Sequence, residues 1–136
     1  MRHARDSDSY EVASSRLALQ RSRNRQIRAF AQMMINHHTR SAAELARLQG
    51  TRGASRAEPE SEPKSQMLDK LRSSARAEFD MNYVQGRLAA HVKAVELHRT
   101  YAATGQNAAL RQFAQRATDL VQDHLSRARA LPRSPR

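Results

Sequence analysis

Apolar side chains recur along this chain at the three- and four-residue spacing of a helix face, not at the two-residue spacing of a strand. Within residues 24–48, one face of such a helix collects a stripe made of Ile27, Phe30, Met34, Leu45 and Leu48. The opposite face of this range is polar. The pattern therefore predicts an amphipathic helix over residues 24–48.

Three further helices follow from the same pattern. The first is expected to begin among residues 6–9, whose Asp and Ser side chains are N-cap types, and to end near Ser22. The third is expected over residues 77–104, with Gly105 as its C-terminal stop, and the fourth over residues 107–131. Helix-forming residues also return briefly at 67–71. Because no segment alternates like a strand, the fold class is all-α.

The organisation of the chain follows from where Gly, Pro and Ser gather. They dominate residues 50–66, which therefore read as a flexible linker between the second and third helices. A single domain is expected over residues 9–131, preceded by a flexible N-terminus at 1–8 and followed by a disordered basic tail at 132–136. Four helices connected in this way predict an antiparallel four-helix bundle.

Composition adds constraints on partners. The chain has 136 residues, of which 39% are apolar and 4% aromatic, and its 24 Lys and Arg against 13 Asp and Glu give a net charge of +11. Such a charge can attract an acidic protein or an anionic surface. The arginines are spread along every predicted helix instead of forming one stripe, which favours a solvated basic surface over a specific nucleic-acid site. The sequence does not define the oligomeric state.

Other classes are excluded by residues that the chain lacks. It contains no Cys, so a disulfide, a thiolate metal site and the Cys-x-x-Cys-His attachment of haem are all ruled out. No apolar run approaches the roughly 20 residues of a membrane-spanning helix. The first ten residues lack the apolar centre of a signal peptide, so we expect either a cytoplasmic protein or the mature form of an exported one.

Each predicted helix carries one strong polar group on its apolar face: Glu11, His38, His91 and His124. At ~1.5 Å per residue, Glu11 and His38 are nearly level across the first helical hairpin, and His91 and His124 differ by about 7 Å across the second. A single buried His is more often a hydrogen-bonded core residue than a ligand. Three His and a Glu near one level instead favour a metal site, with a hydrogen-bonded network of Glu11 and protonated His as the alternative.

Four segments resemble a bacterial family that is classed only as a domain of unknown function: EVASSRLAL, IRAFAQMMINHHTRSAAEL, FDMNYVQGRLAAHVKAVEL and LVQDHLSRARAL. The resemblance covers about residues 9–131. Members of that family are ferritin-like helical bundles, mostly exported and often labelled as outer-membrane proteins, so the resemblance implies a ferritin-like bundle in the periplasm or otherwise exported. The recurrent residues of the family pattern are matched here by Glu11, His38, Phe79, Asp80, His91 and His124.

The chain departs from that family pattern at two places. His37 stands where the family usually has Asp directly before its His, and Thr118 and Asp119 stand where it usually has Leu-Pro. The first departure changes a neighbour of the expected site. The second suggests an altered approach to the fourth helix.

The donor set indicates which metal chemistry to expect. Ferritin-like di-iron sites need Glu-x-x-His on two helices, and no Glu-x-x-His occurs in this chain, which disfavours a di-iron centre. Three His and one Glu suit one divalent ion, Zn, Cu or Fe, with His37 and Asp80 as outer neighbours. If Glu11 lies outside the ligand set, the histidines alone leave one coordination position open.

Two functions are in competition. The leading hypothesis is a non-catalytic metal-binding bundle that acts in metal handling or envelope stress. The alternative is a structural or interaction module, whose basic surface binds an acidic partner and whose buried His and Glu form a network without metal. An enzyme ranks third, because the chain shows no nucleophile arrangement, Gly-rich phosphate loop or paired carboxylates.

Overall fold

The computed structural model of the chain describes residues 2–49 and 62–132, with side chains described for 8–49 and 64–132. Five helices make up most of these residues: α1 (Arg2–Arg21), α2 (Arg25–Gln49), α3 (Glu62–Arg72), α4 (Phe79–Thr104) and α5 (Ala108–Arg129). No strand occurs in the two described ranges. The prediction of an all-α chain is confirmed.

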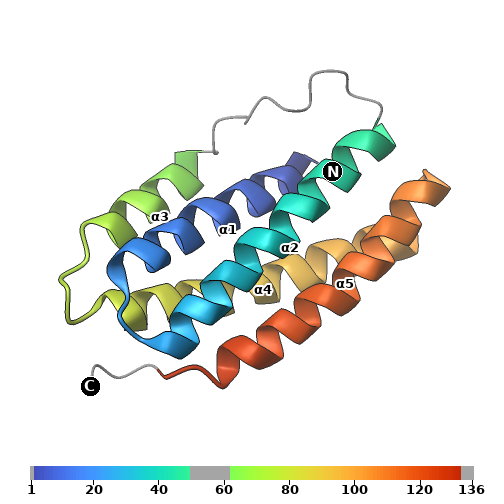
Figure 1. Ribbon diagram of the computed structural model, residues 1–136. Coiled ribbons are helices and arrows are strands. Elements are labelled where there is room, and N and C mark those ends of the chain that lie inside the picture. The colour runs from blue at the N-terminus through green and yellow to red at the C-terminus, as the bar shows by residue number, and fades with distance from the viewer. Residues whose placement is uncertain (1, 50–61, 133–136) are drawn as a thin grey trace.

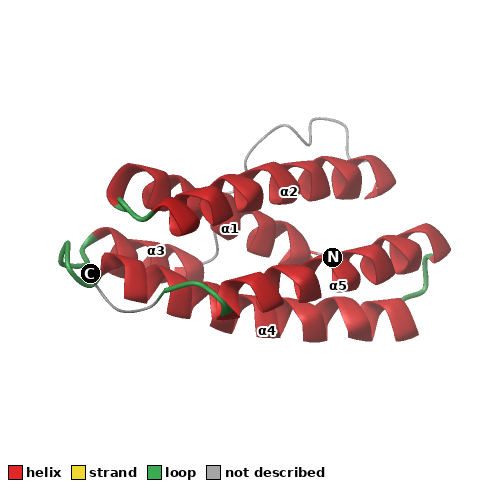
Figure 2. Cartoon of the chain, turned by 60° about the horizontal axis from the view of Figure 1, so that its bottom comes forward, coloured by secondary structure: helices red, strands yellow, loops and turns green. Residues whose placement is uncertain are grey.

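The four long helices pack in pairs. In sequence order α1 packs against α2 and α4 packs against α5, while α1 also contacts α4 and α2 also contacts α5. The short helix α3 lies against α1 and α4 (Figure 1). In Figure 2, α1 and α2 lie above α4 and α5. Side chains that point inward from all four long helices therefore face a common interior.

Two element boundaries differ from those expected from the sequence. Helix α1 begins at Arg2, before the expected start among residues 6–9, so most of the N-terminus predicted to be flexible is helical. Helix α3 begins at Glu62, inside the predicted linker. It accommodates Pro63 because a proline in the first helical turn loses no intrahelical hydrogen bond. Of the remaining predicted segments, residues 50–61 and 133–136 lie outside the described residues.

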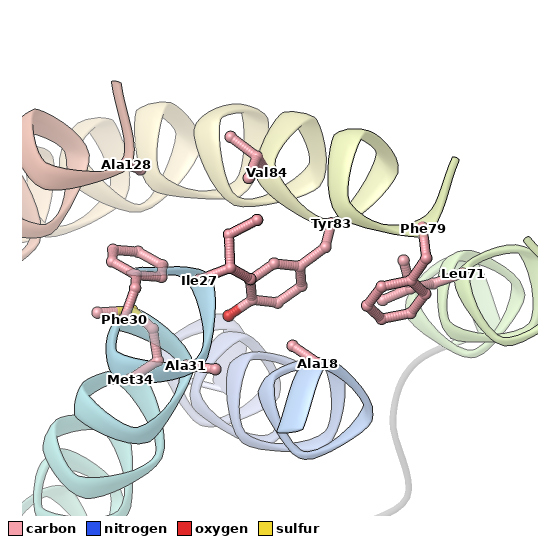
Figure 3. Packing of buried hydrophobic residues seen from close by; sticks show 10 residues of the cluster. All are labelled: Ala18, Ile27, Phe30, Ala31, Met34, Leu71, Phe79, Tyr83, Val84 and Ala128. Atoms are coloured by element: carbon pink, nitrogen blue, oxygen red, sulfur yellow. The ribbon is translucent and has the colours of Figure 1, made fainter. Parts of the chain in front are cut away.

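The largest apolar cluster has residues from all five helices, most of them from α2 and α4. Tyr83 reaches from α4 to a position between Ile27 and Ala18, as Figure 3 shows. Its hydroxyl group is hydrogen-bonded to Ser15 Oγ at 2.7 Å, so the one polar atom of this buried ring is satisfied. Leu71 brings α3 into the same cluster. Burial of such apolar side chains stabilises the packing of the helices, and it fixes their relative register.

The start of α5 gives a direct test of local structure. The side chain of Asn107 accepts a hydrogen bond from the backbone N–H of Leu110 at 3.0 Å, which caps the helix. We expect Asn107→Ala to lower the free energy of unfolding by about 1 kcal/mol, because that donor loses its partner. Urea denaturation would measure the loss. Asn107→Ser should retain most of the stability, and an equal loss in both variants would contradict the capping role.

Candidate metal centre

Three buried histidines from three helices meet in the interior. His38 lies on α2, His91 on α4 and His124 on α5, and they are 5%, 1% and 0% exposed. Their ring centroids are separated by 6.0, 5.4 and 5.6 Å. One ring nitrogen from each lies within 4.8 Å of those of the other two. We call this set the three-histidine cluster.

Helical periodicity explains why each ring points inward. His38 follows the buried Met34 by four residues, so both lie on the same face of α2. His124 lies three residues after Val121 and four before Ala128, both of which are buried on α5. His91 continues the stripe on α4 that also buries Val84. The three histidines therefore lie on the same helix faces as the apolar side chains that pack the helices together, and this places their rings in the interior.

Each ring of the cluster is held by a hydrogen bond at one of its two nitrogens. The three bonds join His38 Nδ1 to Asp8 Oδ1 at 2.7 Å, His91 Nδ1 to the carbonyl oxygen of Arg87 at 2.6 Å, and His124 Nε2 to His37 Nδ1 at 2.7 Å. The oxygen partners require that Nδ1 of His38 and of His91 carries the proton and donates. In the third pair the tautomers of the two rings decide whether His124 Nε2–H or His37 Nδ1–H is the donor. The oxygen partners thereby set the tautomers of His38 and His91.

The other nitrogen of each ring has no hydrogen-bond partner among the described residues: His38 Nε2, His91 Nε2 and His124 Nδ1. An unpartnered buried polar atom costs roughly 1–3 kcal/mol. Because Nδ1 of His38 and of His91 carries the proton, the unpartnered Nε2 of each of these two rings carries a lone pair. One nitrogen of each of the three rings lies within 4.8 Å of those of the other two. Three neutral imidazoles close together are a donor set by which proteins bind Zn, Cu or Fe.

The protonation states of two of the three rings favour metal binding. Burial lowers the pKa of His91, although the Glu11 carboxylate opposes the shift. Burial, with the nearby His38, lowers the pKa of His124 to about 2. His38 differs, because its hydrogen bond to Asp8 outweighs the effect of burial and raises the pKa above the usual imidazole value. His91 and His124 are therefore neutral near pH 7, which is the form that binds metal.

Glu11, predicted as a fourth ligand, lies beside the cluster and is paired with Arg87. Its Oε2 accepts a hydrogen bond from Arg87 Nη1 at 2.9 Å, and its Oε1 lies 3.9 Å from His91 Nδ1. The unpartnered nitrogen of His91 is Nε2, so the carboxylate faces the other edge of that ring. Burial acts to raise the pKa of Glu11, but Arg87 and His91 together hold it below its usual value. The structure thus brings together three of the four predicted residues, with Glu11 as the counter-charge of Arg87.

The two predicted outer neighbours lie in different places. His37 is half-buried and makes the hydrogen bond to His124 described above. Asp80 is half-buried in the first turn of α4, about three turns before His91, and is not a member of the cluster. Another histidine, His98, is buried further along α4 with its ring against Phe113, at a centroid distance of 6.2 Å.

Sequence reasoning missed two residues that support the cluster. Asp8 lay in the segment expected to be flexible, yet it is 5% exposed and holds His38. It precedes Glu11 by three residues, so helical periodicity placed both on one face once the helix was extended toward the N-terminus. Arg87 precedes His91 by four residues and is fully buried. Because Arg87 and His91 share one face of the helix, the sequence could have predicted that Arg87 is buried beside the cluster.

These features define an all-helical domain whose long helices direct polar side chains at one buried point. The chain belongs to the family described as Domain of unknown function (DUF4142), whose profile matches residues 1–131. The family resemblance seen in the sequence is therefore confirmed. Comparison with curated proteins and with solved structures gave no match. Within the described ranges, no helix has the length and apolar character needed to cross a membrane.

Proposed function

We propose that this protein binds one divalent transition-metal ion, Zn, Cu or Fe, through His38, His91 and His124, and that it does so without catalysing a reaction. The observation that supports this proposal is a cluster of three buried histidines, in which each ring has one unpartnered nitrogen and one nitrogen of each ring lies within 4.8 Å of those of the other two. A metal ion would satisfy all three atoms at once. No hydrogen-bond donor among the described residues does so.

The required movement is small. Zn–N bonds are about 2.0–2.1 Å long, so two nitrogens on one tetrahedral ion lie about 3.4 Å apart. Closing the cluster from separations of up to 4.8 Å to this distance needs only side-chain adjustments of the three rings. Asp8 and the carbonyl oxygen of Arg87 would keep two of those rings oriented as they close.

Charge also favours a cation here. Glu11 offsets the positive charge of Arg87, so the two buried groups are neutral as a pair. The Asp8 carboxylate behind His38 is then the nearby group whose negative charge favours a metal ion. In this proposal three histidines ligate and the fourth position of a tetrahedral ion stays open to water or to a small ligand. Glu11 acts from outside the ligand set.

The wider role follows from the family resemblance and the charge. We propose a ferritin-like four-helix bundle that is exported to the periplasm and handles metal or responds to envelope stress. The net charge of +11 would serve to associate it with an acidic protein or an anionic surface. The alternative, a purely structural module, needs the three unpartnered nitrogens to find hydrogen-bond partners instead of a metal.

Metal-dependent thermal stability tests the proposal. At about a hundred times the dissociation constant, Zn or Cu should stabilise the untagged protein by roughly 2.7 kcal/mol and raise its melting temperature. His91→Gln should abolish most of that shift. His98→Gln is the matched control, because it alters a buried histidine on the same helix outside the cluster.

Each outcome of this experiment decides between the two functions. A metal-induced shift in the wild type and in His98→Gln, but not in His91→Gln, supports the three-histidine site. Elemental analysis of the loaded protein should then give one metal per chain. If no first-row divalent ion shifts the melting temperature, or if His91→Gln keeps the full shift, the structural module is the better description.

A further inference from the structure

A groove of about 640 Å³ lies at the surface between α4 and α5, and we call it the α4–α5 groove. It is separate from the three-histidine cluster, because none of the cluster residues lines it. Its volume falls within the range of about 300–1,000 Å³ that is usual for small-molecule sites. The residues that line it are Leu88, Ala89, Val92 and Lys93 from α4, and Leu125 and Arg129 from α5.

Apolar side chains form most of the α4–α5 groove. Leu88 and Val92 are four residues apart, so they lie one turn apart on the same face of α4, and Leu125 joins them from α5. Leu88 and Leu125 are half-buried, whereas Val92 is 51% exposed. A single exposed valine is common, but here it continues an apolar surface that begins in the helix interface. An apolar ligand that covers this surface removes it from water, which favours binding.

The charged residues that line the groove, Lys93 and Arg129, are both cations, although the chain carries 13 acidic residues. Asp123, an acidic residue two positions before Leu125, is paired with Arg127 at 2.9 Å. The lining of the groove therefore combines an apolar surface with charge of one sign. This combination suits a ligand that has an apolar body and an anionic group.

The two cations lie toward opposite ends of the groove. Helices α4 and α5 run antiparallel (Figure 1), and the rings of His91 and His124 are level with each other, with centroids 5.6 Å apart. Lys93 follows His91 by two residues along α4. Arg129 follows His124 by five, in the opposite direction. The two cations are therefore separated along the helices by about seven residues, on the order of 10 Å, and an elongated ligand fits between them.

We propose that the α4–α5 groove binds a single-chain amphiphile with an anionic headgroup, of the chemistry of a fatty acid. The headgroup lies at Lys93, and the tail lies along Val92 and Leu88 toward the other end of the groove. Arg129, at that other end, already has an interaction partner, so Lys93 is the cation assigned to the headgroup. This inference goes beyond the proposed function, because the ligand needs neither the cluster histidines nor a metal ion.

Titration calorimetry with three ligands tests the two parts of this amphiphile. Decanoate, kept below the concentration at which it forms micelles, has both the tail and the carboxylate. Decanol has the same tail with a neutral headgroup, and butanoate has the carboxylate with a short tail. In EDTA, which excludes any effect of metal, we expect decanoate to bind at one molecule per chain. Decanol should bind about tenfold more weakly, because it lacks a charged partner for Lys93, and butanoate should not bind measurably.

Two variants and two matched controls locate the ligand. Val92→Asp puts a carboxylate on the apolar surface and Lys93→Glu reverses the charge at the headgroup, so each should weaken decanoate binding by about tenfold or more. Met67→Asp is the control for Val92→Asp, because Met67 is the other exposed large apolar residue in the described ranges and lies on α3. Lys70→Glu, also on α3, changes the net charge as Lys93→Glu does. Both controls should bind decanoate as the wild type does.

The proposal is overturned if Lys93→Glu and Lys70→Glu weaken binding equally, because net charge and not the groove would then attract the ligand. It is also overturned if Val92→Asp binds decanoate as the wild type does. Binding to vesicles of anionic phospholipid without binding to decanoate in solution would contradict it as well, and would indicate contact with a membrane surface. A failure of the proposed metal site is distinguishable, because it removes the metal-induced shift in melting temperature and leaves these titrations in EDTA unchanged.

Discussion

Glu11→Gln is expected to lower the free energy of unfolding by about 3–5 kcal/mol, because it leaves the charged guanidinium of Arg87 in the core without a counter-charge. Arg87 is 0% exposed and Glu11 is 2% exposed. The guanidinium lies over the rings of Tyr10 and Tyr83, at 4.7 and 5.2 Å from their centroids, and it contacts Ser14. These neutral groups cannot replace the carboxylate charge.

A double variant shows whether the pairing is the cause. Changing Glu11→Leu and Arg87→Met together removes both charges, and it should restore most of the stability lost in Glu11→Gln, as measured by urea denaturation. The matched surface control is Glu44→Gln, whose partner Arg116 is largely exposed. It should cost less than about 1 kcal/mol. If the double variant is as unstable as Glu11→Gln, the loss has another origin than an unpaired charge.

The metal-free protein should lose stability as the pH falls below about 6.5, the ordinary imidazole value. Burial lowers the pKa of both His91 and His124, so the unfolded chain binds protons that the folded chain excludes. With a pKa of about 2, His124 alone accounts for about 2 kcal/mol between pH 6.5 and pH 5, and His91 acts in the same direction. His38 acts oppositely. Its raised pKa contributes stability that is full below the unfolded value and is lost as the pH rises through the folded one.

Urea denaturation in EDTA at pH 7.5, 6.5 and 5 would measure this dependence. His124→Gln cannot be protonated, so its stability should fall less between pH 6.5 and pH 5 than that of the wild type. His98→Gln, in which the pKa of another buried histidine no longer contributes, shows how much of the slope comes from outside the cluster. An identical slope in the wild type and in His124→Gln would show that burial of this ring does not govern the acid response.

The sequence predicted the long helices because their apolar stripes are continuous. Ile27, Met34, Phe113 and Val121 are all buried, as helical periodicity required. Only part of helix α3 was predicted, the helix-forming residues at 67–71, because Pro, Ser and charged residues surround its short apolar stretch. Its buried Leu68 and Leu71 stabilise the fold by packing against residues of α1 and α4. Periodicity within one segment cannot reveal such contacts.

The sequence could predict which residues lie in the candidate site, but not which of them contact one another. Each cluster histidine lies in its own apolar stripe, and this was visible without knowing how the helices meet. Which side chains contact one another depends on how far each helix is shifted along its neighbour, and the sequence does not give that shift. Glu11 was estimated to be level with His38, but Asp8, about one turn earlier, makes the contact. Glu11 is level instead with Arg87, on a helix far away in sequence.

The position of the three cluster histidines on α2, α4 and α5 has a consequence for a chain that contains no cysteine. An ion bound by His38, His91 and His124 would be a reversible cross-link between segments distant in sequence. Like a disulfide, such a cross-link restricts the conformations of an unfolding chain, and the restriction grows with the length of the loops that it closes. Metal supply, instead of an oxidising environment, would then decide whether these helices can separate.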